Sequence, residues 1–139
     1  MLIYIEGNIG SGKSTFIELL NNHLDKFRIE PNVVLEPVDD WLNTKDSDGK
    51  HILEKFYEDQ EKWSFAFQMN SFISRVNSIY NAVVIDSGNT ENPPQQERDE
   101  LTFHEYDIVF VERSVFTDKY CFADMCHKGG KMNDIEYNI

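Results

Sequence analysis

Apolar positions along the chain follow two different periods. Short apolar runs, typical of strands buried in a parallel sheet, occupy residues 2–6, 32–36 and 107–111. Between and after them, apolar residues recur at helical spacing over 15–27, 52–80 and 117–125. Strands that alternate with helices predict an α/β fold, in which parallel strands are joined by right-handed crossovers and flanked by helices.

The pattern predicts one domain over residues 1–139. Its longest helical stretch, 52–80, has a wide apolar face and a predicted break near Asp59–Lys62, so we expect it to cross a ligand site. Residues 86–105 are mostly polar and contain Pro93-Pro94, which predicts a flexible insertion rather than a linker between domains.

A glycine-rich loop joins the first predicted strand to the first predicted helix. It fits the phosphate-binding pattern G-x-x-x-x-G-K-S and is formed, with the residue after it, by Gly7, Asn8, Ile9, Gly10, Ser11, Gly12, Lys13, Ser14 and Thr15. Backbone N–H groups of such a loop cradle phosphates, the Lys13 ammonium reaches the β and γ oxygens, and the Ser14 hydroxyl is placed for Mg²⁺. The sequence therefore predicts binding of a nucleoside triphosphate.

Composition limits the partners. The formal net charge of −12 argues against a nucleic-acid or anionic-membrane surface. The chain has no apolar run long enough to span a bilayer and no basic targeting segment at its start. We therefore expect a cytoplasmic protein, without support for a mitochondrial location. Cys121 and Cys126 are interpreted as two buried thiols rather than a metal site.

Each predicted strand ends in a carboxylate, and ligands gather at the carboxyl ends of parallel strands. Glu36 follows the second strand and is the candidate base that takes the proton of an acceptor hydroxyl. Glu112 follows the third strand and is a candidate Mg²⁺ ligand, while Arg113 can anchor Glu36 and the acceptor oxygen. The alternatives are a strand-capping Glu36 and a purely structural ion pair for Glu112 and Arg113.

The long helix carries a polar stripe within its apolar face. Gln68, Ser71 and Arg75 lie on one side of it, because residues seven apart nearly eclipse each other. An amide and a guanidinium offer the paired donors and acceptors that read the edge of a base, and nearby aromatic residues could form pocket walls. In the alternative, Gln68 and Arg75 lie at the helix margin and point to solvent.

Taken together, these features resemble the deoxynucleoside kinase family across nearly the whole chain. The motifs that carry the resemblance are Gly7 to Thr15, Leu35-Glu36-Pro37-Val38 with Trp41, Trp63-Ser64-Phe65 with Phe67-Gln68, and Glu112-Arg113-Ser114-Val115 with Asp118 and Tyr120. The resemblance implies a P-loop kinase fold, with ATP and Mg²⁺ as phosphate donor and cofactor and a deoxynucleoside as acceptor. It also implies a homodimer.

The resemblance assigns roles residue by residue. It implies that Glu36 activates the 5′-hydroxyl and that Arg113 holds both this hydroxyl and Glu36. The other residues implied to bind substrate are Trp41, Tyr57 at the 3′-hydroxyl, Gln68 at the base, Ser71, Phe72, Arg75, Asp118, and Phe122 in the base pocket. Because Ser71, Arg75 and Asp118 occupy positions associated with selectivity, the resemblance favours purine deoxynucleosides, or deoxycytidine.

The chain departs from the family after its third strand. Family members continue through further parallel strands and an arginine-rich lid, whereas no arginine follows Arg113 here. We therefore expect a fold that lacks the last strands and the lid, with an unpaired edge beside the phosphate-loop strand. The predicted activity is deoxynucleoside phosphorylation in salvage. The alternative is a truncated nucleotide-binding pseudoenzyme or one half of a split kinase.

Two other classes of P-loop protein fit less well. A nucleoside monophosphate kinase would need a cation where Glu36 stands, because a carboxylate repels an acceptor phosphate. A GTPase would carry an Asn-Lys-x-Asp motif for the base, and the sequence contains none.

Overall fold

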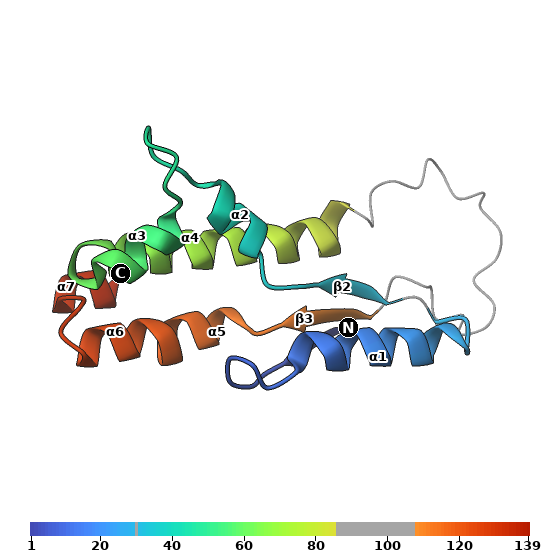
Figure 1. The fold of residues 1–139 in the computed structure, drawn as a ribbon. Coiled ribbons are helices and arrows are strands. Elements are labelled where there is room, and N and C mark those ends of the chain that lie inside the picture. Colours follow the sequence, from blue (N-terminus) through green and yellow to red (C-terminus); the bar gives the residue numbers. More distant parts are fainter. Residues whose placement is uncertain (30, 86–107) are drawn as a thin grey trace. The chain divides into compact units, whose positions relative to one another are not determined.

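The computed structural model describes residues 1–29, 31–85 and 108–139, so the predicted insertion at 86–105 lies outside the described residues. The chain divides into two compact units (Figure 1). The first comprises Met1–Leu35 and the described part of Ser78–Arg113, and the second comprises Glu36–Asn77 and Ser114–Ile139. The long helix α4 (Gln60–Tyr80) begins in the second unit and ends in the first.

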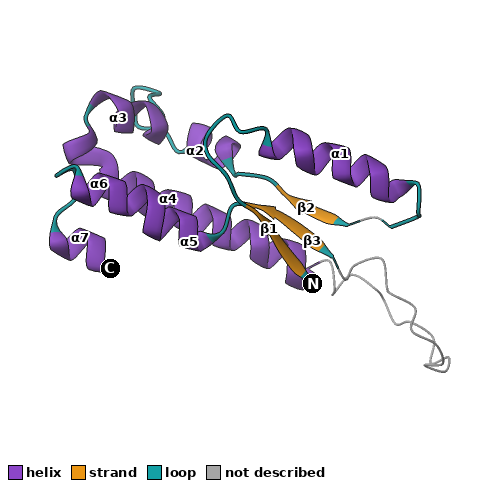
Figure 2. Cartoon of the chain, turned by 90° about the horizontal axis from the view of Figure 1, so that it is seen from below, coloured by secondary structure: helices purple, strands orange, loops and turns teal. Residues whose placement is uncertain are grey.

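A three-stranded parallel sheet forms the centre of the first unit (Figure 2). Its strands are β1 (Leu2–Ile5), β2 (Asn32–Val34) and β3 (Val109–Glu112), in the order β1-β3-β2. This confirms the predicted parallel α/β architecture. The strand beside β1 is β3 rather than β2, and within the described residues β1 is paired on one side only. The carboxyl end of β3 is therefore the strand end next to the phosphate loop.

Helices cover the strands of the first unit. Helix α1 (Lys13–Asp25) packs against β3, and its Ile17 is almost fully buried. Val34, Val109 and Val111 form a core cluster with Ile79 of α4 and Ala82 of the π-helical turn η1 (Asn81–Ile85). Helix α1 begins two residues before the predicted start, because Gly12 takes a left-handed conformation (φ 83°) and lets the helix begin directly at Lys13.

The second unit is helical. It contains most of α4 together with α2 (Val38–Asn43), α3 (Ile52–Glu58), α5 (Val115–Thr117), η3 (Asp118–Ala123), α6 (Asp124–Lys128) and α7 (Asp134–Asn138). The predicted break in the long helix is confirmed, since α3 ends at Glu58 and α4 begins at Gln60. The helix predicted over 117–125 instead runs from Val115 to Lys128, with the π-helical segment η3 in its middle.

The core of this second unit is aromatic. Trp41, Phe56, Phe67, Ala123, Cys126 and Met132 form it. The Phe67 ring stacks on Phe56 at a centroid distance of 4.8 Å and meets the Trp41 ring edge-on at 5.4 Å. Cys126 is buried here, whereas Cys121 is exposed, so the prediction of buried thiols is correct for one of the two.

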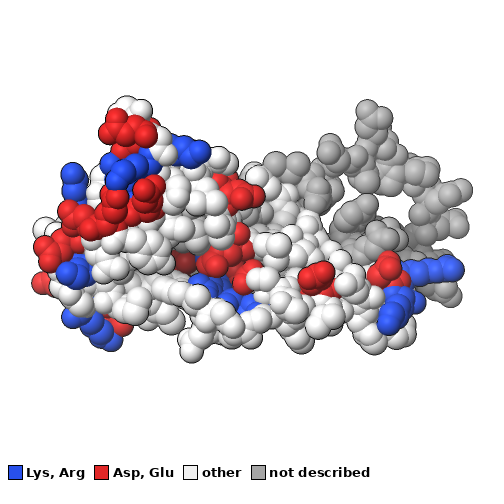
Figure 3. Space-filling view, viewed as in Figure 1, with Lys and Arg blue, Asp and Glu red and all other residues white. Residues whose placement is uncertain are grey.

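Charged side chains of the second unit neutralise one another locally. Around the loop between α2 and α3, Lys55 pairs with Asp46 and Lys50 with Glu58, and Figure 3 shows blue and red side chains interleaved there. Within the ranges given above, no helix is long and apolar enough to cross a membrane.

Two phenylalanines of α4 give a matched test of the core. Phe67 is 8% exposed and Phe72 is 39% exposed. We expect Phe67→Ala to lower the free energy of unfolding by about 3–5 kcal/mol, because it leaves a cavity between two rings. Phe72→Ala should cost less than about 1 kcal/mol. Urea denaturation of both variants measures the difference, and equal losses would contradict the assigned core.

Arg113, directly after β3, has a strained backbone. Its φ is +65°, a conformation that side chains other than glycine rarely adopt, and its N–H donates to the Ile5 carbonyl. Such strain at a buried arginine suggests that function, not stability, selects the side chain.

Replacing Arg113 by alanine and by glycine separates the strain from the side-chain contacts. Both changes remove the same contacts, but glycine adopts this φ without a steric penalty. We expect the free energy of unfolding of Arg113→Gly to exceed that of Arg113→Ala by about 1 kcal/mol. Denaturant titration checks this, and an alanine variant at least as stable as the glycine variant would refute it.

Candidate active site

The phosphate loop of the first unit is held against the end of β3. Ile5 pairs with Glu112 across the parallel strands β1 and β3, so the loop starts beside this carboxylate. The Ser14 hydroxyl donates to the Glu112 carboxylate, with both oxygens at 3.0 Å, and Glu112 is only 6% exposed. The structure therefore brings together the two residues that the sequence predicts as metal ligands.

Lys13 lies over the same loop. Its Nζ donates to the carbonyl of Asn8 at 2.8 Å and lies 3.9 Å from Glu112 Oε1. The charged Lys13 side chain is buried, so partners within the protein must compensate its charge, as this carbonyl and carboxylate do. A phosphate bound in the loop would meet an ammonium that is already oriented toward it.

Glycine is needed in this loop for steric reasons. A Cβ on Gly7 would lie 2.8 Å from Ser11 Oγ, closer than Cβ atoms approach other atoms in folded proteins, so the Ser11 side chain would have to move. Gly12 ends the loop in a left-handed conformation and precedes α1, whose free N–H groups and dipole favour an anion at this point.

The second unit contains a buried ion cluster around Arg75. Arg75 Nε donates to Asp118 Oδ2 at 2.7 Å, and Nη2 donates to Asp118 Oδ1 at 3.2 Å. The same Nη2 donates to Glu36 Oε1, also at 3.2 Å. Arg75 is 1% exposed and Asp118 3% exposed. Glu36, the candidate general base, and Asp118, a candidate residue for reading the nucleobase, thus share one guanidinium.

The remaining residues of the predicted polar stripe point inward as well. Ser71 Oγ donates to Asp118 Oδ1 at 3.5 Å, and the Gln68 amide lies 3.9 Å from Cys126 Sγ. Because Gln68 is 8% exposed and Ser71 4% exposed, the alternative that this stripe faces solvent is wrong.

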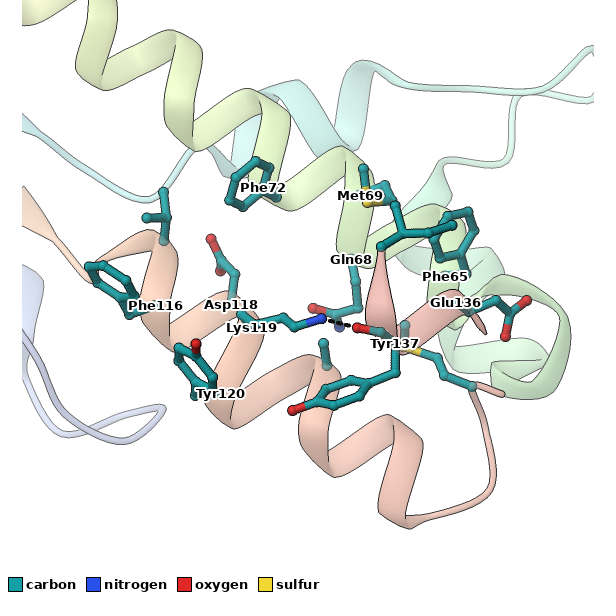
Figure 4. Close-up of a pocket in the computed structure, with 14 residues that line it drawn as sticks. Phe65, Gln68, Met69, Phe72, Phe116, Asp118, Lys119, Tyr120, Glu136 and Tyr137 are labelled. Atoms are coloured by element: carbon teal, nitrogen blue, oxygen red, sulfur yellow. Dashed lines mark hydrogen bonds between the residues drawn. The ribbon is translucent and has the colours of Figure 1, made fainter. Parts of the chain in front are cut away.

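A pocket of about 360 Å³ opens in the second unit between α4, η3 and α7 (Figure 4). Of the predicted substrate residues, Gln68, Phe72 and Asp118 line it. Its other walls are mostly apolar or aromatic, and the Lys119 ammonium, hydrogen-bonded to the Tyr137 carbonyl, crosses one side.

Other predicted substrate residues lie away from this pocket. Trp41 is 7% exposed, and its Nε1–H donates to Ser74 Oγ at 3.0 Å. Tyr57 is 69% exposed, and Phe122 is half-buried. Ser74 was not predicted, although its place three residues after Ser71, on the same helix face, could have indicated it.

Ser14 and Glu112 fit the metal that the phosphate loop implies. Mg²⁺ prefers oxygen ligands, and a hydroxyl and a carboxylate that already meet provide two. Glu36 belongs to the second unit and Arg113 to the first, so the predicted contact between them stays a prediction.

Comparisons with known proteins show which proteins this chain resembles. The profile of the deoxynucleoside kinase family matches residues 3–139. A probable deoxycytidine kinase of fowlpox virus is 34% identical over 99% of this chain, and deoxycytidine kinase 1 of Xenopus laevis is 33% identical over 99%. The mitochondrial deoxyguanosine kinase of Xenopus laevis is 28% identical over 97% of the chain.

These relatives are longer proteins. The matched region covers 45% of the fowlpox protein and 49% and 48% of the two Xenopus proteins, so the chain spans about half of their length. The match nevertheless includes the phosphate loop, the long helix and the segment after β3. The chain belongs to the deoxynucleoside kinase family.

Proposed function

We propose that this chain transfers the γ-phosphate of ATP to the 5′-hydroxyl of a deoxynucleoside in nucleotide salvage. The observation that carries the proposal is the buried two-point contact of Arg75 with Asp118, a polar pair on α4 and η3 that would recognise the nucleobase. The phosphate loop in the same chain would supply the donor site. The kinase names of the relatives support this reaction class.

The donor half of the reaction rests on the first unit. Loop N–H groups, the Lys13 ammonium and the N-terminus of α1 would bind the phosphates of ATP. Ser14 and Glu112 would hold Mg²⁺, which neutralises charge on the β- and γ-phosphates. The buried Glu112 also keeps Lys13 oriented toward the loop.

The proposed acceptor site depends on the carboxylate of Glu36. Glu36 would accept the proton of the 5′-hydroxyl while that oxygen bonds to the γ-phosphorus, and the bond from the γ-phosphorus to the bridging oxygen of ADP breaks. Arg113 would hold the attacking oxygen and stabilise the charge that develops. A neutral hydroxyl suits this carboxylate, whereas an acceptor phosphate would be repelled.

The nucleoside would be recognised by the buried polar stripe. Gln68 would pair with the base, and Ser71, Arg75 and Asp118 would set base preference toward purine deoxynucleosides or deoxycytidine. Phe72 would line the base pocket, and Tyr57 would contact the 3′-hydroxyl. The family resemblance also assigns Phe122 to the base pocket, although Phe122 is not among the residues that line the pocket of the structure. Because Trp41 is buried against Phe67, it would support this pocket from behind. We further propose a cytoplasmic homodimer.

The first test is ATP-dependent phosphorylation of each of the four deoxynucleosides by the purified chain. We expect turnover above a Lys13→Ala blank. Glu36→Gln should lower kcat by about 10²–10⁴, the usual contribution of a general base, without changing the affinity for ATP. A coupled ADP-release assay measures turnover, and calorimetry measures ATP binding.

Two results would contradict this assignment. Folded wild-type protein that gives no turnover with any deoxynucleoside would favour a nucleotide-binding pseudoenzyme or half of a split kinase. A Glu36→Gln variant that loses ATP binding as strongly as turnover would remove Glu36 from its role as base.

A second prediction concerns base preference. Arg75→Met combined with Asp118→Ala removes the buried ion pair and leaves an apolar pocket wall. We expect the ratio of kcat/KM for thymidine to that for deoxycytidine to rise by at least about tenfold, because groups left unpaired in a closed pocket cost about 1–3 kcal/mol. Competition assays measure this ratio. Ser47→Ala, on an exposed loop, is a control, and an unchanged ranking would refute the pocket assignment.

A further inference from the structure

Arg75 joins two carboxylates that come from distant parts of the sequence. Glu36 precedes α2, and Asp118 begins η3, while Arg75 projects from α4. Its Nη2 lies 3.2 Å from one oxygen of each carboxylate. The guanidinium is almost completely removed from solvent, so its charge is compensated by protein groups rather than by water.

One cation shared between two anions couples them energetically. A guanidinium has a fixed planar fork, so a movement that improves its geometry toward one carboxylate changes its geometry toward the other. Burial strengthens this dependence, because water does not screen the charges at 1% exposure. The Glu36 side chain is 21% exposed and the Asp118 side chain 4%, so Glu36 is the more exposed of the two partners.

Resting on the function proposed above, we propose that Arg75 is a positioning residue that couples the base pocket to Glu36. A nucleobase that engages Asp118 and Arg75 shifts the guanidinium toward the pocket and loosens its hold on Glu36. The carboxylate is then free to turn toward the 5′-hydroxyl. Occupation of the base pocket thereby prepares the general base, and Arg75 acts on the reaction through Glu36 as well as on selectivity.

The coupling can be measured without turnover. The probes are 5′-deoxy analogues of the four deoxynucleosides, which carry the base and sugar but no 5′-hydroxyl. These analogues keep the 3′-hydroxyl but have no 5′-hydroxyl, so the effect of Glu36 on their binding no longer includes a contact with the acceptor oxygen. Calorimetry gives the Kd for wild type, Glu36→Gln and a charge-matched control, Asp39→Asn, at an exposed position of α2.

We expect Glu36→Gln to lower the Kd of the best analogue by at least about fivefold, a typical coupling between linked sites, because Arg75 is released to the pocket. Asp39→Asn should leave the Kd unchanged. In an Arg75→Met background, the effect of Glu36→Gln should disappear, which completes a double-mutant cycle. If Arg75→Met does not fold, Arg75→Lys takes its place, and the effect of Glu36→Gln should then be smaller than with arginine.

Other outcomes would overturn the coupling. A Kd that Glu36→Gln leaves unchanged, or changes equally with and without Arg75, would show that Arg75 does not connect the two sites. Failure of every analogue to bind would overturn it as well. Parallel turnover assays with natural deoxynucleosides separate the two proposals: turnover without coupling refutes only the role of Arg75, and coupling without turnover refutes only the proposed activity.

Discussion

The arrangement of the second unit depends on how a single buried guanidinium is neutralised. Arg75 is 1% exposed, and an uncompensated charge at that depth would be strongly destabilising. The carboxylates of Asp118 and Glu36 neutralise the Arg75 charge. The start of η3 and the segment before α2 must therefore both face α4. This requirement explains why a polar stripe occurs within an apolar helix face. It also explains why the carboxylate nearest the predicted chemistry is held by a residue of the predicted base pocket.

The first unit follows a different constraint, that of parallel pairing. Parallel strands bring their carboxyl ends to one edge, and the β1-β3 register aligns Ile5 with Glu112. The glycine-rich loop leaves β1 at this edge, and α1 begins at Lys13, so Lys13 and Ser14 meet Glu112 without any further arrangement. Sheet topology thus positions Glu112, the predicted metal ligand, while side-chain electrostatics position Glu36, the predicted general base.

Sequence patterns predicted the parts of this protein that local rules determine. The strands, the break between α3 and α4, and the choice of Ser14 and Glu112 as metal-ligand candidates follow from hydrophobic period, turn chemistry and strand ends. The order of the strands could not be predicted, because the hydrophobic period along the sequence does not show which strands are neighbours. Nor did the hydrogen bond from Trp41 to Ser74, or the sharing of Arg75 between Asp118 and Glu36, since both depend on tertiary contacts between distant segments. The roles of the predicted site residues, Glu36 and Arg113 included, stay predictions.

The net charge of the chain affects both the phosphate loop of the first unit and the ion cluster around Arg75 in the second. With a net charge of −12, the protein repels anions in general, so a phosphate must be attracted by a local positive site. In the first unit, Lys13 faces one carboxylate, Glu112, and the N-terminus of α1 adds its positive dipole end beside it, whereas in the second unit the cation Arg75 is matched by two carboxylates. The cluster around Arg75 therefore offers little net attraction to an anionic ligand. The substrates proposed above, a triphosphate donor and an uncharged acceptor, fit this distribution of charge.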